Sequence, residues 1–404
     1  MFSIISLFLI TSCKGGGDSA GALTMPFLGG SQGLEMKFLQ GNPPAEVTDD
    51  GNLPFKAIVT LVNQGEFDLA STQVEVGLSG FLAEDFGVTA ADKGKLKNQP
   101  PDDNPIARKK DSEGNILEAI EVSVPFPSKA DGDDFNYARP LPGNRPFLFR
   151  AEVCYRYGAQ VVSEICVLKN MIDIIDDAPC DPSESKSVFS SASPLGITAF
   201  RQNVVGKDKI QFSFDIVHSG SGDVFAIDPD LDNARIHILN ALIELKRATS
   251  DTTAVGEQAG KAREILNKIT TIQDITEVIT LLESATEENL NKAIAKLDGV
   301  IVDCPKDASV RRSKEDKVRV TVDTGIKDND EDTAPDIELI CVGLGKNKGG
   351  IVSGLANLVN GKRTVTCTQT FSTTRPDFIQ PMDITLDFNY LDSIDKNILV
   401  KHLG

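Results

Sequence analysis

Six of the seven cysteines in this chain of 404 residues could form disulfide bonds. They are Cys154, Cys166, Cys180, Cys304, Cys341 and Cys367. The even number is what a disulfide framework requires. Zinc binding is the alternative, but the chain has no Cys-x-x-Cys pair, and its three histidines lie away from these cysteines in the sequence. Because disulfides persist in oxidising compartments, the set indicates a protein outside the cytosol.

The strand-like segments predict which of these cysteines pair. Cys154 and Cys166 lie in two apolar runs, and Gly158-Ala159 separates the runs. The runs cover residues 147–157 and 160–168, so we expect a hairpin in which the two cysteines face each other.

The pairing of the remaining four cysteines can then be predicted. Cys341 and Cys367 flank a stretch of strand and turn, residues 343–362, and are expected to join neighbouring strands. Cys180 is then left to pair with Cys304. Such a bond would close a long loop and stabilise the fold by several kcal/mol, about 5 in the chain-entropy model.

The seventh cysteine could carry a lipid. Residues 2–10 are apolar, Thr11 and Ser12 are small, and glycines follow shortly after Cys13. This order is typical of a signal peptide whose cysteine is lipidated, and the apolar run is far shorter than the ~20 residues that span a bilayer. A secretory signal usually carries a basic residue before its apolar run, and none is present, so a buried N-terminal strand with a chance cysteine is the alternative.

Carboxylates at alternate positions could bind calcium. The residues are Asp328, Asp330, Asp332 and Asp336. Oxygen ligands at this density suit Ca²⁺. An EF-hand loop would need Gly at its sixth position and Glu at its twelfth, where this chain has Thr333 and Leu339. The alternative is a solvated acidic loop.

Two glycine-rich segments resemble catalytic loops without having the required spacing. Residues 343–350 follow a strand but fit neither the Rossmann nor the Walker pattern. Residues 218–223 begin with His218 but lack the Gly-x-Ser-x-Gly order of a nucleophile elbow. We expect both to be turns, no catalytic residues, and a protein that is not an enzyme.

Composition narrows the class further. Hydrophobic residues make up 40% of the chain, enough for folded cores, and the length suggests two or three domains. The net charge of −18 disfavours binding to nucleic acid. The chain has no Trp and four Tyr, which lowers the expectation of a carbohydrate-binding cleft.

Period-two alternation of apolar residues predicts a mainly β fold with two immunoglobulin-like β-sandwich domains. Clear examples are Val74, Val76 and Leu78 near the start, and Met382 to Tyr390 near the end. Asn360-Gly361 predicts a hairpin turn. The expected organisation is a signal peptide at 1–12, a flexible tether at 13–33, a first domain at 34–170, a linker at 171–192 and a second domain at 193–404.

Residues 231–299 lose the strand pattern and take on helical spacing. Ile236, Leu239 and Ile243, for example, fall on one helical face. About four short helices are expected as an insertion in the second domain, each with one apolar stripe to bury. One interpretation of the stripes is a helical bundle, either self-contained or packed on the sandwich. The other is a surface that recognises a partner.

Residues 55–78, FKAIVTLVNQGEFDLASTQVEVGL, have a strand, an Asn-x-Gly turn and a second strand. This segment resembles the CARDB-type immunoglobulin-like repeats of prokaryotic surface proteins. Residues 212–224 are similar to it, with His218 where Asn is expected. The segment GLEMKFLQGNPP and the paired β domains resemble uncharacterised archaeal secreted lipoproteins. The resemblance implies a sandwich fold and a surface role, and it transfers no catalytic residue.

Together these features predict an extracytoplasmic protein held to a membrane through a lipid on Cys13. The expected function is non-catalytic: adhesion, surface architecture or presentation of a binding module to a protein partner at the cell surface. The alternative is a ligand-binding lipoprotein that serves a transporter or an envelope assembly. No cofactor is expected beyond the possible Ca²⁺.

Overall fold

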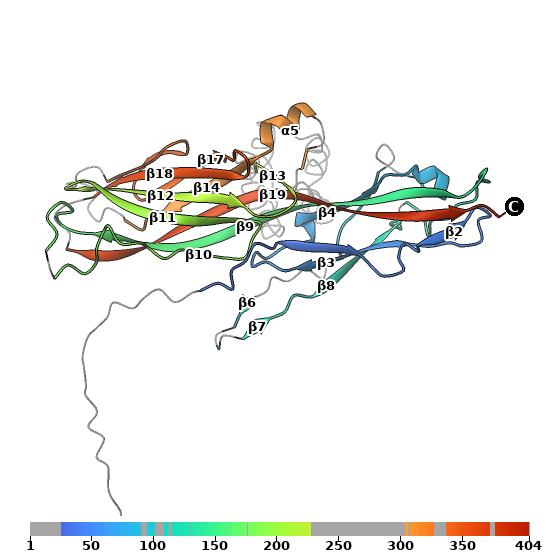
Figure 1. The fold of residues 1–404 in the computed structure, drawn as a ribbon, viewed down its shortest axis with the longest axis horizontal. Coiled ribbons are helices and arrows are strands. Elements are labelled where there is room, and N and C mark those ends of the chain that lie inside the picture. The colour runs from blue at the N-terminus through green and yellow to red at the C-terminus, as the bar shows by residue number, and fades with distance from the viewer. Residues whose placement is uncertain are drawn as a thin grey trace, which may run out of the picture.

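The computed structural model describes residues 26–403 except 90–94, 102–108, 112, 114, 130, 176, 228–303, 306–307, 327–336 and 372–375. The described residues are mainly β-strands, as the alternating pattern predicts. Figure 1 shows an elongated arrangement in which most strands follow the long axis. Cys13 and the expected helical insertion at 231–299 lie outside the described residues.

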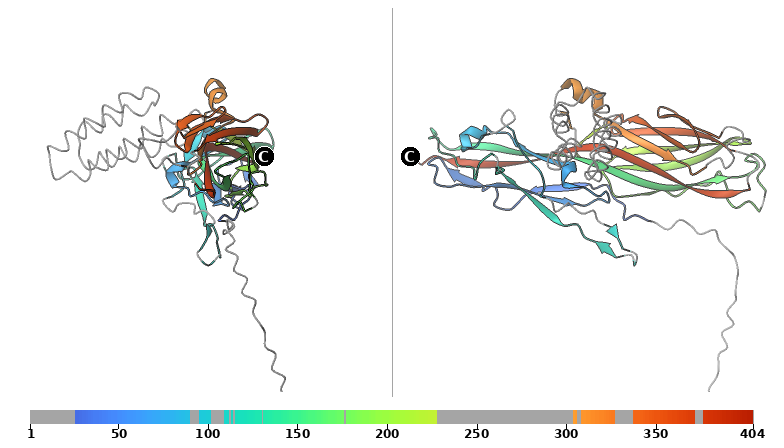
Figure 2. Two further views of the ribbon diagram at one scale, coloured as in Figure 1. Left: turned by 90° about the vertical axis from the view of Figure 1, so that its left-hand side faces the viewer. Right: turned by 180° about the vertical axis from the view of Figure 1, so that it is seen from behind.

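Two long strands, β9 (Arg145–Val167) and β19 (Phe378–Lys401), form the axis of the molecule. They pair antiparallel from Arg145 opposite Val400 to Val167 opposite Phe378. At about 3.3 Å per residue, β9 spans about 75 Å. Figures 1 and 2 show this ribbon running through both halves of the molecule, with the C-terminus at one end.

The predicted hairpin around Gly158-Ala159 is wrong, because β9 continues straight through these residues. From residue 149 onward every odd-numbered side chain of the strand is buried: Phe149, Ala151, Val153, Tyr155, Tyr157, Ala159, Val161, Ser163, Ile165 and Val167. The disulfide-bonded Cys154 and Cys166 are the buried side chains of the opposite face. A two-residue turn would have moved the inward face to even positions after Ala159. Those positions include Gln160 and Glu164, which are polar, so the sequence carried a signal against the turn.

The first half of the molecule has two layers. One layer is a small sheet of β1 (Leu34–Phe38), β3 (Ala57–Asn63) and β8 (Glu121–Phe126). The other is the ribbon with β2 (Glu46–Thr48), β4 (Val74–Ser79) and β5 (Leu96–Asn98). Smaller elements are η1 (Ser71–Gln73), η2 (Ala83–Phe86) and the hairpin of β6 (Lys109–Lys110) and β7 (Ile116–Leu117).

The second half repeats this layering. One sheet has the order β11 (Leu195–Gly206), β12 (Lys209–His218), β18 (Lys362–Thr370), β15 (Glu338–Cys341) and β16 (Gly345–Lys348). The ribbon adds β10 (Phe189–Ser190), β13 (Asp223–Phe225), β14 (Lys317–Asp323) and β17 (Ile351–Asn357). A short helix, α5 (Ala308–Lys314), precedes β14.

The expected linker at 171–192 does not separate two independent sheets. The end of β19 belongs to the predicted second domain, yet it pairs with the first part of β9 and with β2. The end of β9 in turn pairs with β10 and with the start of β19. Each half therefore receives a strand from the other, and one continuous group of buried apolar residues extends through both.

The turn at Asn360-Gly361 forms, and Val359 and Lys362 pair across it in an antiparallel bridge, but the hairpin extends no further. Asn360 and Gly361 have positive φ, 52° and 72°, as the sequence predicts. The strands on either side enter different sheets, since β17 pairs with β14, and β18 pairs with β12 and β15. The turn thus carries the chain from one layer to the other.

All six cysteines form disulfides, and one predicted pair is confirmed. Cys341 and Cys367 are direct cross-strand partners in β15 and β18, with Cα atoms 4.0 Å apart. The other two predicted pairs are wrong. Cys154 and Cys166 lie on the same face of one strand, twelve residues or about 40 Å apart, and cannot meet. The observed pairs are Cys154 with Cys304 and Cys166 with Cys180.

Candidate functional site

Three of the four tyrosines meet near the middle of the ribbon, in a region that we call the crossover site. Tyr155 and Tyr157 come from β9, and Tyr390 comes from β19. The ring of Tyr155 lies 5.5 Å from each of the other two rings, and all three side chains are buried. The tyrosines pack where the strands pass from one half of the molecule to the other.

The turn after β3 closes over Tyr157. The buried Tyr157 hydroxyl donates a hydrogen bond of 2.8 Å to Asn63 Oδ1, which also accepts from the Gly65 amide at 3.2 Å. Asn63 Nδ2 donates to the Phe67 carbonyl at 2.7 Å, so both ends of the side-chain amide are hydrogen-bonded. Burial raises the pKa of Tyr157, which keeps its hydroxyl a donor.

The turn after β12 makes the equivalent contact with Tyr390. The Gly222 amide donates to the Tyr390 hydroxyl at 2.7 Å, and His218 Nε2 lies 3.2 Å from the same oxygen. Burial raises the pKa of Tyr390 to about 12 and lowers the pKa of His218. Residues 218–223 therefore form a turn, as predicted, in which His218 pairs with a phenol.

The start of the described chain is fixed at the same site. The Glu66 carboxylate accepts hydrogen bonds from three backbone amides: Leu28 at 2.8 Å, Gly29 at 3.0 Å and Ala192 at 2.7 Å. Glu66 belongs to the turn after β3, and Ala192 lies before β11. One carboxylate thus joins the entering chain to both halves. Sequence reasoning missed Glu66, because nothing local marks an acid that caps distant amides.

The segment 228–303 leaves and rejoins the fold on the outer face of the ribbon. Cys304 returns the chain to Cys154 through a disulfide, beside the buried side chains of Phe225 and Leu391. Since Cys154 lies in β9 and Phe225 pairs with Asn389 of β19, both ends of this segment are joined to the ribbon. The attachment lies within a few residues of Tyr155 and Tyr390.

An ion-pair network supports this attachment. Arg311 of α5 pairs with Asp223 at 2.7 Å and with Glu315 at 2.6 Å. Its guanidinium also lies 5.3 Å from the centre of the Phe225 ring. The two carboxylates raise the pKa of Arg311, which remains charged. The return path of the segment therefore packs firmly on β13.

The other predicted site residues are not brought together in the described part of the chain. Cys13 and the possible calcium ligands Asp328, Asp330, Asp332 and Asp336 lie outside it. Within the described residues, no three His, Cys, Asp or Glu side chains form a group that could hold a metal ion. The turn expected at residues 343–350 is shorter than predicted: residues 342–344 form a turn, and Gly345–Lys348 form strand β16.

Comparison with known proteins identifies no relative. No family model, curated protein or solved structure matches this chain. In the part of the chain described here, no helix is long and apolar enough to cross a membrane.

Proposed function

We propose that this protein is an exported, non-catalytic scaffold, anchored by a lipid on Cys13, that presents residues 228–303 to a protein partner at the cell surface. Its two halves are proposed to be immunoglobulin-like sandwiches of the CARDB type that exchange their last strands. One observation carries the proposal. The entering chain, held by Glu66, and the attachment of residues 228–303, held by Cys154–Cys304, both meet the ribbon at the crossover site.

This arrangement suits presentation. A paired ribbon about 75 Å long, buried on its inner face in both halves, is a stiff support. Three disulfides add stability to this support, and such bonds persist in an oxidising compartment. Surface adhesion or architecture is the role that such a support serves.

The membrane anchor is tested by Cys13→Ser in the expressed full-length chain. The variant should leave the membrane fraction and appear in the soluble extracytoplasmic fraction, while the wild-type protein stays with membranes. Cys13 is the one cysteine not used in a disulfide, so the substitution leaves the three bonds intact. An unchanged membrane fraction would contradict the anchor.

Presentation is tested by proximity labelling on intact cells. Replacing residues 231–299 with a short Gly-Ser linker should remove the labelled partners and leave the three disulfides in place. The matched control changes exposed apolar residues elsewhere, Ile116→Ser with Leu117→Ser in β7, and should keep the partners. If the linker variant labels the same partners as the wild-type protein, residues 228–303 are not the presented module.

A further inference from the structure

An exposed apolar loop lies at the end of β9, at the end of the molecule opposite the C-terminus (Figure 1). In residues 168–179, Ile172, Ile174 and Ile175 are 69%, 45% and 60% exposed. The neighbouring hairpin of β11 and β12 adds Val205, which is 48% exposed. We call these four residues the apolar tip. Three exposed isoleucines on one loop, with an exposed valine on the hairpin that the loop bonds to through Met171 and Lys207, mark a candidate interaction surface.

The loop that carries the apolar tip is firmly held. Met171 is 1% exposed and anchors the loop in the core, and its amide donates to the Lys207 carbonyl at 3.3 Å. The Lys169 amide donates to Asp377 Oδ1 at 2.5 Å, and the Ala178 amide donates to the Ile175 carbonyl at 3.1 Å. These contacts fix the backbone of the loop in the conformation that exposes the isoleucines.

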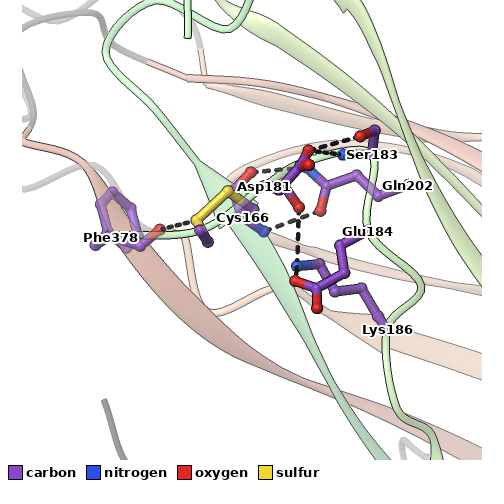
Figure 3. A network of polar contacts seen from close by, with 8 residues as sticks. Cys166, Asp181, Ser183, Glu184, Lys186, Gln202 and Phe378 are labelled. Carbon is purple, nitrogen blue, oxygen red and sulfur yellow. Dashed lines mark hydrogen bonds and ion pairs between the residues drawn. A yellow bond between two sulfur atoms is a disulfide. The ribbon is translucent and has the colours of Figure 1, made fainter. Parts of the chain in front are cut away.

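The base of the loop is closed by the Cys166–Cys180 disulfide, with Cα atoms 5.8 Å apart. Figure 3 shows the polar contacts around it. Gln202 of β11 exchanges two hydrogen bonds with the backbone of Cys166, at 2.7 and 2.9 Å. Beyond Cys180, Asp181 accepts from the amide and the hydroxyl of Ser183. The disulfide and these bonds fix both ends of the loop to the second half.

The path of the entering chain indicates what covers the apolar tip. Gly29 packs on the Ser190 carbonyl, 3.6 Å from where a Cβ would lie, and Ser190 pairs with Val161 in β9. From Val161 to the end of β9 at Val167 is six residues, or about 20 Å. The chain from Cys13 to Leu28 can extend over at most about 50 Å. A lipid on Cys13 therefore easily reaches the plane of the apolar tip.

The opposite end of the molecule is farther from the anchor. From Val161 back to Arg145 is sixteen residues of β9, or about 53 Å, which is the full reach of the tether. The apolar residues exposed at that end, such as Leu53 and Leu403, lie singly on separate loops. The length of the tether and the grouping of exposed apolar residues thus both favour membrane contact at the end that carries the apolar tip.

From this geometry, and resting on the proposed lipid anchor, we propose that the apolar tip inserts into the lipid surface to which Cys13 is anchored. The isoleucines enter the boundary between headgroups and acyl chains. Three lysines and three aspartates are exposed on the same two loops: Lys169, Lys207, Lys209, Asp173, Asp177 and Asp208. The lysines can reach lipid phosphates, while the carboxylates stay in the water at the headgroup surface. The second half then faces the membrane, and the first half with the C-terminus points away from it.

The absence of tryptophan allows a direct test. Ile174→Trp places a single fluorophore in the apolar tip, and Leu53→Trp places one at the opposite end with similar exposure, 45% against 49%. Each protein is coupled through the Cys13 thiol to a maleimide lipid in phosphatidylcholine and phosphatidylglycerol vesicles. Brominated acyl chains should quench the Ile174→Trp protein by about half with a blue shift, and leave the Leu53→Trp protein unchanged.

Two further measurements make the result decisive. Adding Ile172→Ser and Ile175→Ser to the Ile174→Trp protein should abolish the quenching. In the otherwise unsubstituted coupled protein, amide exchange in residues 172–178 should slow on vesicles. The proposal is overturned if the Ile174→Trp and Leu53→Trp proteins are quenched equally. It is also overturned if neither is quenched and amide exchange in residues 172–178 is unchanged on vesicles. Chemical coupling bypasses natural lipidation, so this outcome is separate from the membrane fractionation of Cys13→Ser, which tests the anchor itself.

Discussion

Tyr155 of β9 and Tyr390 of β19 are direct partners in the antiparallel register, and their ring centres lie 5.5 Å apart. Tyr155 accepts a hydrogen bond from the Leu34 amide of the first half, and Tyr390 accepts one from the Gly222 amide of the second half. The pair therefore joins the two halves through both the ribbon and the adjoining turns. We expect the halves to unfold together, because neither keeps its core without strands from the other.

The bond between Tyr157 and Asn63 can be measured by a double-mutant cycle. Tyr157→Phe removes the buried donor and leaves Asn63 Oδ1 with the Gly65 amide alone. Each of Tyr157→Phe and Asn63→Ala should lower the free energy of unfolding by about 1–3 kcal/mol. In urea titrations the double variant should lose less than the sum of the two. Strict additivity would show that the two groups do not interact.

Gly65 should not tolerate a side chain. A Cβ at this position would overlap the Tyr157 hydroxyl and come within 2.7 Å of the carbonyl oxygens of Ala192 and Gln32. Gly65→Ala should therefore destabilise the protein by about 3 kcal/mol or more, seen as a lower Tm. The control is Gly143→Ala, where a Cβ meets nothing within 4 Å. Equal Tm values for the two variants would mean that the turn does not pack as described.

The disulfide connectivity has a direct chemical test. Peptide mapping without reduction should recover Cys154 linked to Cys304 and Cys166 linked to Cys180, and no peptide that links Cys154 to Cys166. The first bond closes a loop of 150 residues and the second a loop of 14. In the chain-entropy model, replacing each pair by serines costs about 5 and about 3 kcal/mol. The larger loss of stability should follow the loss of Cys154–Cys304.

Acid should weaken the C-terminal end through Asp49. Its buried carboxylate accepts from His402 Nδ1 at 2.7 Å and from the amides of Leu141 and Leu403. These bonds, His402 first, hold the pKa of Asp49 well below its usual range. A lowered folded-state pKa gives stability that is present above the unfolded value of about 3.9 and is lost as the pH falls below it.

The measurement is the free energy of unfolding against pH for the wild-type protein and Asp49→Asn. At about pH 5 the wild-type protein should be more stable than Asp49→Asn. The difference should shrink as the pH falls through 4, because Asp49 then becomes protonated on unfolding. Asp133→Asn, at an exposed aspartate in the same half of the molecule, is the control. A difference that is flat down to pH 2 would rule out the Asp49 contribution.

Local pattern was enough to identify most of the strands. Alternation marked the strands around Val76, Phe212 and Val320, because a half-buried strand exposes every second side chain whatever its partner. Cys341 and Cys367 were predictable as partners, since they lie in adjacent strands near each other in the sequence. The turns at Asn360 and His218 followed from residue types that suit tight backbone.

Only the tertiary structure decided which segments became partners. Polar residues at even-numbered positions after Gly158, such as Gln160 and Glu164, already argued against a hairpin. The partner of β9, however, lies more than 200 residues away in β19, and no local property of the sequence encodes that pairing. The same holds for Cys154 with Cys304 and for Glu66 with Ala192. Strand faces are set by neighbouring residues, whereas strand partners are set by the burial of the whole apolar surface. That is why the sequence predicted two separate β domains, whereas the fold joins two halves through the shared ribbon of β9 and β19.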